Sequence, residues 1–249
     1  MKVKMESSKG EVSVDLSMPI DISMPLRADK QAASAWYVEP MKITPVVMGD
    51  WVGSVKQGGS VNFMDIAFNS HGNGTHTECV GHISKEWHYI TDCLKTFWFE
   101  AKLISVQPQH LSNGDSVFTK NQLESLMGND KVDALILRTL PNDKEKLNLQ
   151  HSNTNWPYLE EEAALFLREK GIKHFLTDQP SIDREFDEGK LLAHHAFWNY
   201  PAAPRLDATI TELVFVPDEV VDGIYMLNIQ IASFENDASP SKPILYRVN

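Results

Sequence analysis

Hydrophobic and polar residues alternate along several short stretches of the chain, and this alternation predicts β-strands that bury one face. The pattern is clear at residues 11–17 (Glu-Val-Ser-Val-Asp-Leu-Ser) and at 61–68. Further strands are predicted at 21–24, 97–106, 172–177, 208–216 and 226–234. Residues 133–139 form a compact apolar run, which indicates a strand buried on both faces. Between residues 25 and 60, frequent Pro, Gly and aromatic residues predict loops and short strands.

Two stretches space their apolar residues as a helix does. The first, at 119–127, is short, and the second, at 158–170, is the clearer one. The apolar face of the second stretch comprises Leu159, Ala163, Phe166 and Leu167. Acidic residues fill its first turn and Gly171 follows its end, as is typical of helix termini. Strands at 133–139 and 172–177 flank this helix, so we expect a mixed α/β or α+β domain with more strand than helix.

The composition is that of one globular domain. The chain has 249 residues, 42% of them hydrophobic, and no Pro/Gly/Ser-rich linker divides it, so we expect a single domain over residues 1–249. Its net charge of -11 argues against nucleic acid and anionic membranes as partners. The apolar runs are too short to span a bilayer, and the N-terminus shows no secretory signal. Two cysteines, Cys79 and Cys93, do not make a disulfide framework, which fits a reducing, cytoplasmic location.

Candidate metal ligands gather in the segment 71–82, which contains His71, His76, Glu78 and His82. Imidazole and carboxylate groups are the usual protein ligands of Zn²⁺ and also suit Mn²⁺. Two glycines between the first two histidines allow a tight turn, and on an extended backbone His76 and Glu78 point to the same side. The alternative is a Gly-rich surface loop that happens to carry histidines. Cys79 is interpreted as a buried free thiol, with a soft metal ligand as the alternative.

A single loop rarely completes a catalytic metal site, so we expect further ligands from distant segments. His194 and His195 are adjacent within an apolar stretch, and Glu212 interrupts an apolar strand. A buried carboxylate is costly unless it is paired or binds a cation. The alternative places Glu212 on the solvent-exposed face of its strand. His174 is interpreted as structural, because it alternates with core positions.

These elements resemble the metal-dependent cyclase/hydrolase family that includes bacterial kynurenine formamidases and isatin hydrolase. The family hallmark His-x-Gly-Thr-His-x-Asp-x-Pro-x-His is similar to residues 74–82, which read Gly-Thr-His-Thr-Glu-Cys-Val-Gly-His. Residues 21–25 resemble the family's early Asp-Leu-Ser-x-Pro element, and residues 177–183 resemble its Asp-Thr-Pro-Ser-x-Asp turn. The pair His194-His195 followed by Glu212 resembles its closing His…Glu pair.

The resemblance implies a metal-binding role for each matching residue. His76 and Glu78 would be ligands, with Glu78 in the place of an aspartate that can bridge two ions. His194, in preference to His195, would complete a second metal position together with Glu212. The site would hold one or two divalent ions per chain, Zn²⁺ in the first place and Mn²⁺ as the alternative.

The resemblance also implies roles around the metal ligands. His82 would be the general acid/base, and Trp36 would line the substrate pocket. One departure concerns the first histidine of the hallmark, because Gly72 stands in its place here and His71 lies one residue further out. His71 would therefore ligate only if the backbone bulges at 72–73. The family has a β/β/α swivelling fold, and its members are homo-oligomers, dimers or tetramers, in which pocket residues can cross the subunit boundary.

The expected function is hydrolysis of an amide in a small molecule, either an aryl formamide or a cyclic amide. A metal-activated water would attack the carbonyl, and His82 would serve as the base because imidazole titrates near neutral pH. Lactone hydrolysis or a dehydration/cyclisation on the same site is an alternative. Metal or ligand binding without catalysis is another, favoured by the offset of His71. A cysteine nucleophile at Cys79 is a weaker alternative.

Overall fold

Seven strands form a closed barrel in the computed structural model, which describes residues 1–8 and 10–248. The strands follow the order β16, β9, β12, β14, β15, β8 and β17, and β17 pairs back onto β16. They are β8 (His76–Glu78), β9 (Trp98–Val106), β12 (Ala134–Thr139), β14 (His174–Thr177), β15 (Thr209–Glu212), β16 (Gly223–Ile231) and β17 (Ala238–Arg247). Strands β9, β12, β14 and β15 run parallel, whereas β8, β16 and β17 each pair antiparallel with their neighbours.

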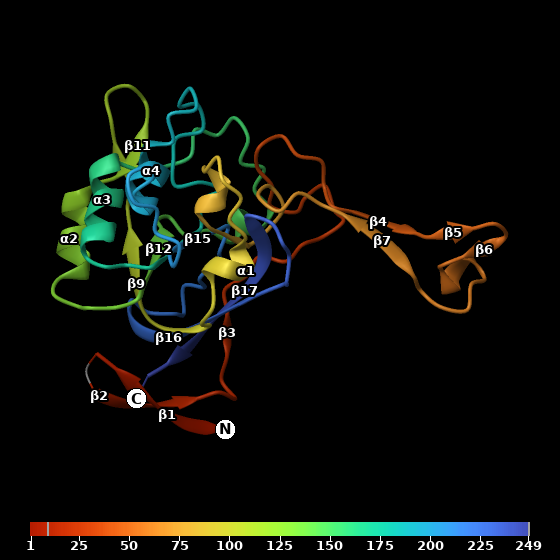
Figure 1. Ribbon diagram of the computed structural model, residues 1–249, viewed down its shortest axis with the longest axis horizontal. Coiled ribbons are helices and arrows are strands. Elements are labelled where there is room, and N and C mark those ends of the chain that lie inside the picture. Colours follow the sequence, from red (N-terminus) through yellow and green to blue (C-terminus); the bar gives the residue numbers. More distant parts are fainter. Residues whose placement is uncertain (9, 249) are drawn as a thin grey trace.

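Three helices cover one side of the parallel strands (Figure 1). They are α2 (Lys120–Met127), α3 (Glu161–Glu169) and α4 (Leu192–Trp198). Thr119 begins α2 with a capping box, in which its hydroxyl accepts from the Gln122 amide and the Gln122 side chain accepts from the Thr119 amide. Alternate residues of β12 enter different apolar layers, because Leu135 and Leu137 face the helices while Ile136 packs in the layer on the other face. This two-sided burial explains the unbroken apolar run of β12.

A long arm projects from the barrel (Figure 1). Strands β4 (Lys42–Pro45) and β7 (Met64–Ala67) form its stem, and β5 (Val47–Met48) and β6 (Trp51–Val52) form its tip. Its exposed apolar side chains include Ile43, Val47, Met48, Phe63 and Ile66, each 45–67% accessible. The remaining elements are β1 (Lys2–Ser7), β2 (Gly10–Asp15), β3 (Ile20–Asp21), η1 (Val55–Gln57), η2 (Val80–His82), α1 (Ile90–Cys93), β10 (Gln109–His110), β11 (Ser116–Phe118), η3 (Lys144–Asn148) and β13 (Tyr158–Leu159). None of the helices within residues 1–8 and 10–248 is long and apolar enough to cross a membrane.

The strand-rich α/β class is confirmed, and so is the strand–helix–strand unit, since β12 and β14 pair in parallel on either side of α3 in sequence. One boundary differs from the prediction. The helix expected from residue 158 begins at Glu161, because Tyr158 and Leu159 pair with β11 instead. His174 is buried, and its Nδ1 lies 2.8 Å from the Thr209 hydroxyl, so its structural interpretation is confirmed.

Candidate metal centre

The segment 71–82 lies at the centre of a cluster of histidine and carboxylate side chains. Its first residue is placed by a turn in which the Asn69 side chain accepts from the amides of His71 and Gly72. Gly72 is required there, since an added Cβ would lie 2.5 Å from a methyl carbon of Val38. The turn supplies the extra residue in the hallmark spacing, and it brings the His71 ring back to Glu78, with 3.0 Å between Nδ1 and Oε2.

Each of three histidine rings turns one nitrogen toward a glutamate and holds the other on an acceptor outside the cluster. His76 Nδ1 lies 3.1 Å from the Gly74 carbonyl, while its Nε2 lies 3.3 Å from Glu212 Oε2. His194 Nδ1 is bound by Asp183, while its Nε2 lies 3.2 Å from Glu78 Oε1. Metal-binding histidines have this arrangement, because the outer acceptor fixes the tautomer and leaves the inner nitrogen free to ligate.

The two glutamates are almost completely enclosed: Glu78 is 1% accessible and Glu212 is 3% accessible. The prediction that Glu212 is buried is therefore confirmed, and the alternative of a solvent-exposed position is wrong. Glu78 extends its two oxygens toward different rings, Oε2 toward His71 and Oε1 toward His194. That arrangement suits a carboxylate between two cation positions.

A divalent cation fits this set of donors. The Gly74 carbonyl can only accept a hydrogen bond, so His76 donates from Nδ1, and in the neutral ring Nε2 carries the lone pair. That lone pair faces the Glu212 carboxylate, and both His76 Nε2 and Glu212 Oε1 are buried without a hydrogen-bond partner. Two electron-rich groups aimed at each other in a buried site need a positive charge between them.

The electrostatics of the cluster follow from the same contacts. Burial opposes charge on His71 and His194, but hydrogen bonds to carboxylates outweigh it. Asp237 and Glu78 raise the pKa of His71 to about 10. Asp183 and Glu78 raise the pKa of His194 to about 10. Burial would raise the pKa of Glu78, yet the neighbouring histidines hold it well below its usual range. Positive charge is therefore favoured at Glu78, and a bound cation would replace the ring protons that otherwise supply it.

The structure does not bring every predicted residue into the cluster. His195 turns away, and its Nδ1 lies 3.0 Å from the Tyr200 carbonyl. His82 lies at the edge, with its Nδ1 3.7 Å from Glu78 Oε2. Cys79 is a buried free thiol, as predicted. It contacts the His88 carbonyl, and Cys93 and burial raise its pKa. A thiol held protonated in this way is a poor nucleophile.

A cavity of about 420 Å³ opens onto the cluster, lined by His71, Glu78, His82, His194 and Glu212. Trp36 forms part of its wall and packs edge-on against Trp156 with 4.9 Å between ring centroids. Both Trp36 and Tyr37 have left-handed backbone conformations, with φ of 59° and 57°, a strained arrangement that favours a functional role.

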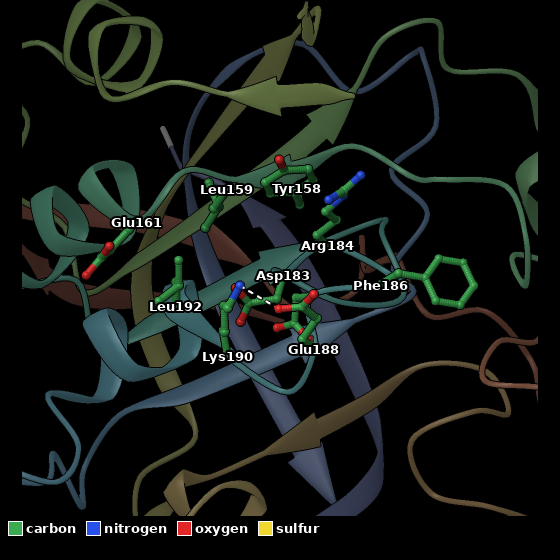
Figure 2. A pocket seen from close by; sticks show the side chains of 10 residues that line it. Tyr158, Leu159, Glu161, Asp183, Arg184, Phe186, Glu188, Lys190 and Leu192 are labelled. Atoms are coloured by element: carbon green, nitrogen blue, oxygen red, sulfur yellow. Dashed lines mark ion pairs between the residues drawn. The ribbon is translucent and has the colours of Figure 1, made fainter. Parts of the chain in front are cut away.

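Residues of the loop 184–191 also line a smaller cavity of about 280 Å³ (Figure 2). Figure 2 shows Asp183 among its lining residues, with the Lys190–Glu188 ion pair at its edge. Arg184 and Asp187 line both cavities, so this loop contributes side chains to each of them.

Sequence reasoning missed two acidic residues that hold histidines of the cluster from outside it. Asp183 ends the segment 177–183, whose family-like pattern was a signal, and it accepts hydrogen bonds from the Ala193 amide and the His194 amide and ring. Asp237 lies 2.8 Å from His71 Nε2. Its local sequence, Glu-Asn-Asp-Ala, carries no signal, because the contact depends on how β16 and β17 close the barrel.

Comparison with known proteins identifies the family to which this chain belongs. The model of the family described as "Putative cyclase" matches residues 14–184. The chain belongs to the Putative cyclase family. Among curated relatives of this cyclase-family chain, the kynurenine formamidase of Bacillus mycoides (strain KBAB4) is 30% identical over 228 residues, which cover 91% of this chain and 96% of the relative. The kynurenine formamidase of Bacillus cytotoxicus is 31% identical over 193 residues, covering 76% and 82%.

Solved structures share the fold of this cyclase-family chain. An isatin hydrolase bound to the product analogue thioisatinate has a TM-score of 0.65 at 13% identity and covers 93% of this chain and 92% of its own. A protein described as a predicted metal-dependent hydrolase, from Bacillus stearothermophilus, has a TM-score of 0.63 at 18% identity and covers 92% and 98%. These likenesses confirm the expected fold.

Proposed function

We propose that this chain is a metal-dependent hydrolase that cleaves a C–N amide bond in a small molecule, either an aryl formamide or a cyclic amide. One observation carries the proposal: the inner nitrogens of His71, His76 and His194 converge on two enclosed glutamates at the end of a cavity. The curated kynurenine formamidases, at about 30% identity over most of the chain, support the aryl formamide class. The isatin hydrolase fold is compatible with the cyclic class.

The ligands divide into two groups around Glu78. His71, His76 and Glu78 form one group whose ligand atoms lie within 4.8 Å of one another. His194 contacts the other oxygen of Glu78, and His82, whose ring would complete a second such group, is assigned as the base and not as a ligand. Glu212 faces His76 from β15. A divalent ion held here, Zn²⁺ or Mn²⁺, supplies Lewis acidity for the amide carbonyl and makes water more acidic.

The remaining chemistry belongs to side chains of the cavity. His82 stands at the edge of the cluster, where it can accept a proton from the attacking water and return it to the departing amine. Trp36 offers an aromatic wall to the aryl ring of the substrate.

The arm supports a proposal about assembly. A two-stranded ribbon is marginally stable in water, and this one exposes apolar side chains such as Ile43, Val47 and Ile66. The charged residues of segment 42–67 are two lysines and two aspartates, so its net charge is zero in a chain of net charge -11. A neutral apolar arm suits contact with a second copy of an acidic protein, and we propose a homo-oligomer held through it.

Elemental analysis of the purified native protein and of the Glu78→Ala variant tests the function. We expect one or two equivalents of metal per native chain, lost in the variant, and turnover of an N-formyl aryl amide or a lactam that His82→Ala abolishes. The control is His110→Ala, an exposed histidine in β10 that contacts Ser116. A native protein that binds no metal would refute the proposal. If the native protein binds metal but does not turn over amides, the amide hydrolase proposal is wrong, and lactone hydrolysis or a binding role takes its place.

A further inference from the structure

Asp237 is fixed in place beside the ligand strand. Its carbonyl accepts a 3.0 Å hydrogen bond from the Cys79 amide, and the next residue, Ala238, pairs with Glu78 across β17 and β8. The loop that carries Asp237 therefore cannot move independently of Glu78. The side chain of Asp237 is 16% accessible, so it is largely removed from water.

The Asp237 carboxylate contacts two histidines through the same oxygen. Oδ2 lies 2.8 Å from His71 Nε2 and 3.5 Å from His82 Nδ1. An ionised carboxylate can only accept, so His71 Nε2, at hydrogen-bonding distance, is held as an N–H donor, and the His82 ring lies within ion-pair distance of the same oxygen. With Nε2 of His71 committed to Asp237, its Nδ1 is the nitrogen left to face Glu78, 3.0 Å away.

The contact with Asp237 matters for His71 in particular, because of where His71 lies in this chain. His71 stands five residues before His76 and reaches Glu78 only through the turn at Asn69, at a ring that is 23% accessible. A partly exposed ring on a turn has more freedom than His76, which is enclosed on a strand. An outer carboxylate removes that freedom and makes the inner nitrogen a better ligand.

We propose that Asp237 is a positioning residue of the metal centre, which orients His71 as a ligand and His82 as a base through one carboxylate oxygen. The inference rests on the proposed function and deepens it, since it places a residue outside the segment 14–184 matched by the family model in the working site. Asp237 thus does for His71 what Asp183 does for His194.

The test compares Asp237→Asn with Glu235→Gln, an exposed carboxylate two residues away on the same loop. Zn²⁺ affinity is measured by competition with a chromophoric chelator, and histidine tautomers are read by ¹H–¹⁵N NMR of the Zn²⁺-loaded protein. We expect Asp237→Asn to bind Zn²⁺ about 10–100-fold more weakly and Glu235→Gln to match the native protein. At saturating Zn²⁺, the kcat of Asp237→Asn should remain below that of the native protein, with little change in KM, because His82 has lost its contact with the Asp237 carboxylate.

The outcomes separate the two proposals. A native protein without Zn²⁺ binding overturns the proposed function, and this inference with it. A native protein that binds Zn²⁺ while Asp237→Asn binds within twofold of it overturns the positioning role alone. If Asp237→Asn does not fold, the native spectrum still decides: His71 must carry its proton on Nε2, and an Nδ1–H tautomer would overturn the inference.

Discussion

Replacing Asp183 with asparagine should weaken metal binding and destabilise the fold together. The Asp183 carboxylate is buried and accepts three hydrogen bonds, from the amides of Ala193 and His194 and from the His194 ring. Asparagine keeps the volume but offers one oxygen and an NH₂ group, so at least one donor would face another donor. His194 would then lose its outer anchor while Glu78 still faces its Nε2.

The magnitude follows from the bonds that are lost. A hydrogen bond to a charged group contributes about 1.5–3 kcal/mol, and one bond is lost and another mismatched, so we expect the free energy of unfolding to fall by about 2–4 kcal/mol. Loss of an outer partner of a metal-binding histidine should also weaken Zn²⁺ binding about 10–100-fold, which is about 1.4–2.8 kcal/mol. Urea unfolding and chelator competition measure the two quantities on the same preparation.

Asp178→Asn provides the matched control. Asp178 is equally buried and accepts from the Thr139 amide and hydroxyl and from Lys146, all outside the metal cluster. Its replacement should cost comparable stability and leave Zn²⁺ affinity unchanged. The reasoning is refuted if Asp183→Asn retains native Zn²⁺ affinity, or if both variants weaken it equally, since the loss would then reflect general destabilisation.

Three further predictions concern other parts of the molecule. His194→Ala should lose at least one equivalent of metal per chain in elemental analysis, and His195→Ala should lose none; equal losses would contradict the assignment. Burial lowers the pKa of His174 to about 3, so this residue binds more protons in the unfolded chain below pH 6.5, and its contribution to stability should fall as pH drops from 6.5 toward 3, by at most about 1.4 kcal/mol per pH unit. His174→Gln should flatten that dependence in urea unfolding across this range, and an unchanged slope would contradict the attribution. Replacing Val47 and Ile66 of the arm with serine should shift the protein to monomer in sedimentation velocity, and an unchanged oligomer would exclude the arm as the interface.

Hydrophobic periodicity predicted those elements whose buried positions can be recognised from the local sequence. The apolar run of β12 and the amphipathic face of α3 lie where the sequence places them. Helix α4 was not predicted, because its seven residues are too few to distinguish a helical period from a continuous apolar run, and its start depends on a left-handed Leu191 and on Asp183, eight residues before Leu191. Strand β17 escaped notice because prolines interrupt its alternation.

The candidate site likewise contains some features that the local sequence predicts and others that it does not. The nearness of His76, Glu78 and His82 follows from their spacing, and the enclosure of Glu212 follows from an apolar strand interrupted by one carboxylate. The contact between His71 and Asp237 spans 166 positions and depends on barrel closure, so no local pattern encodes it.

The closed barrel determines at which stage of folding the metal site can form. Glu78 lies on β8, which is held by β15 on one side and by β17, the last strand of the chain, on the other. Pairings so far apart in sequence form late in folding, because loop-closure entropy opposes them until many contacts cooperate. During synthesis, the histidines of segment 71–82 emerge well before the carboxylates at 212 and 237 that face them. An ion held by this set is therefore selected by the finished barrel and not by the nascent chain, and its binding free energy adds to the stability of the folded state alone.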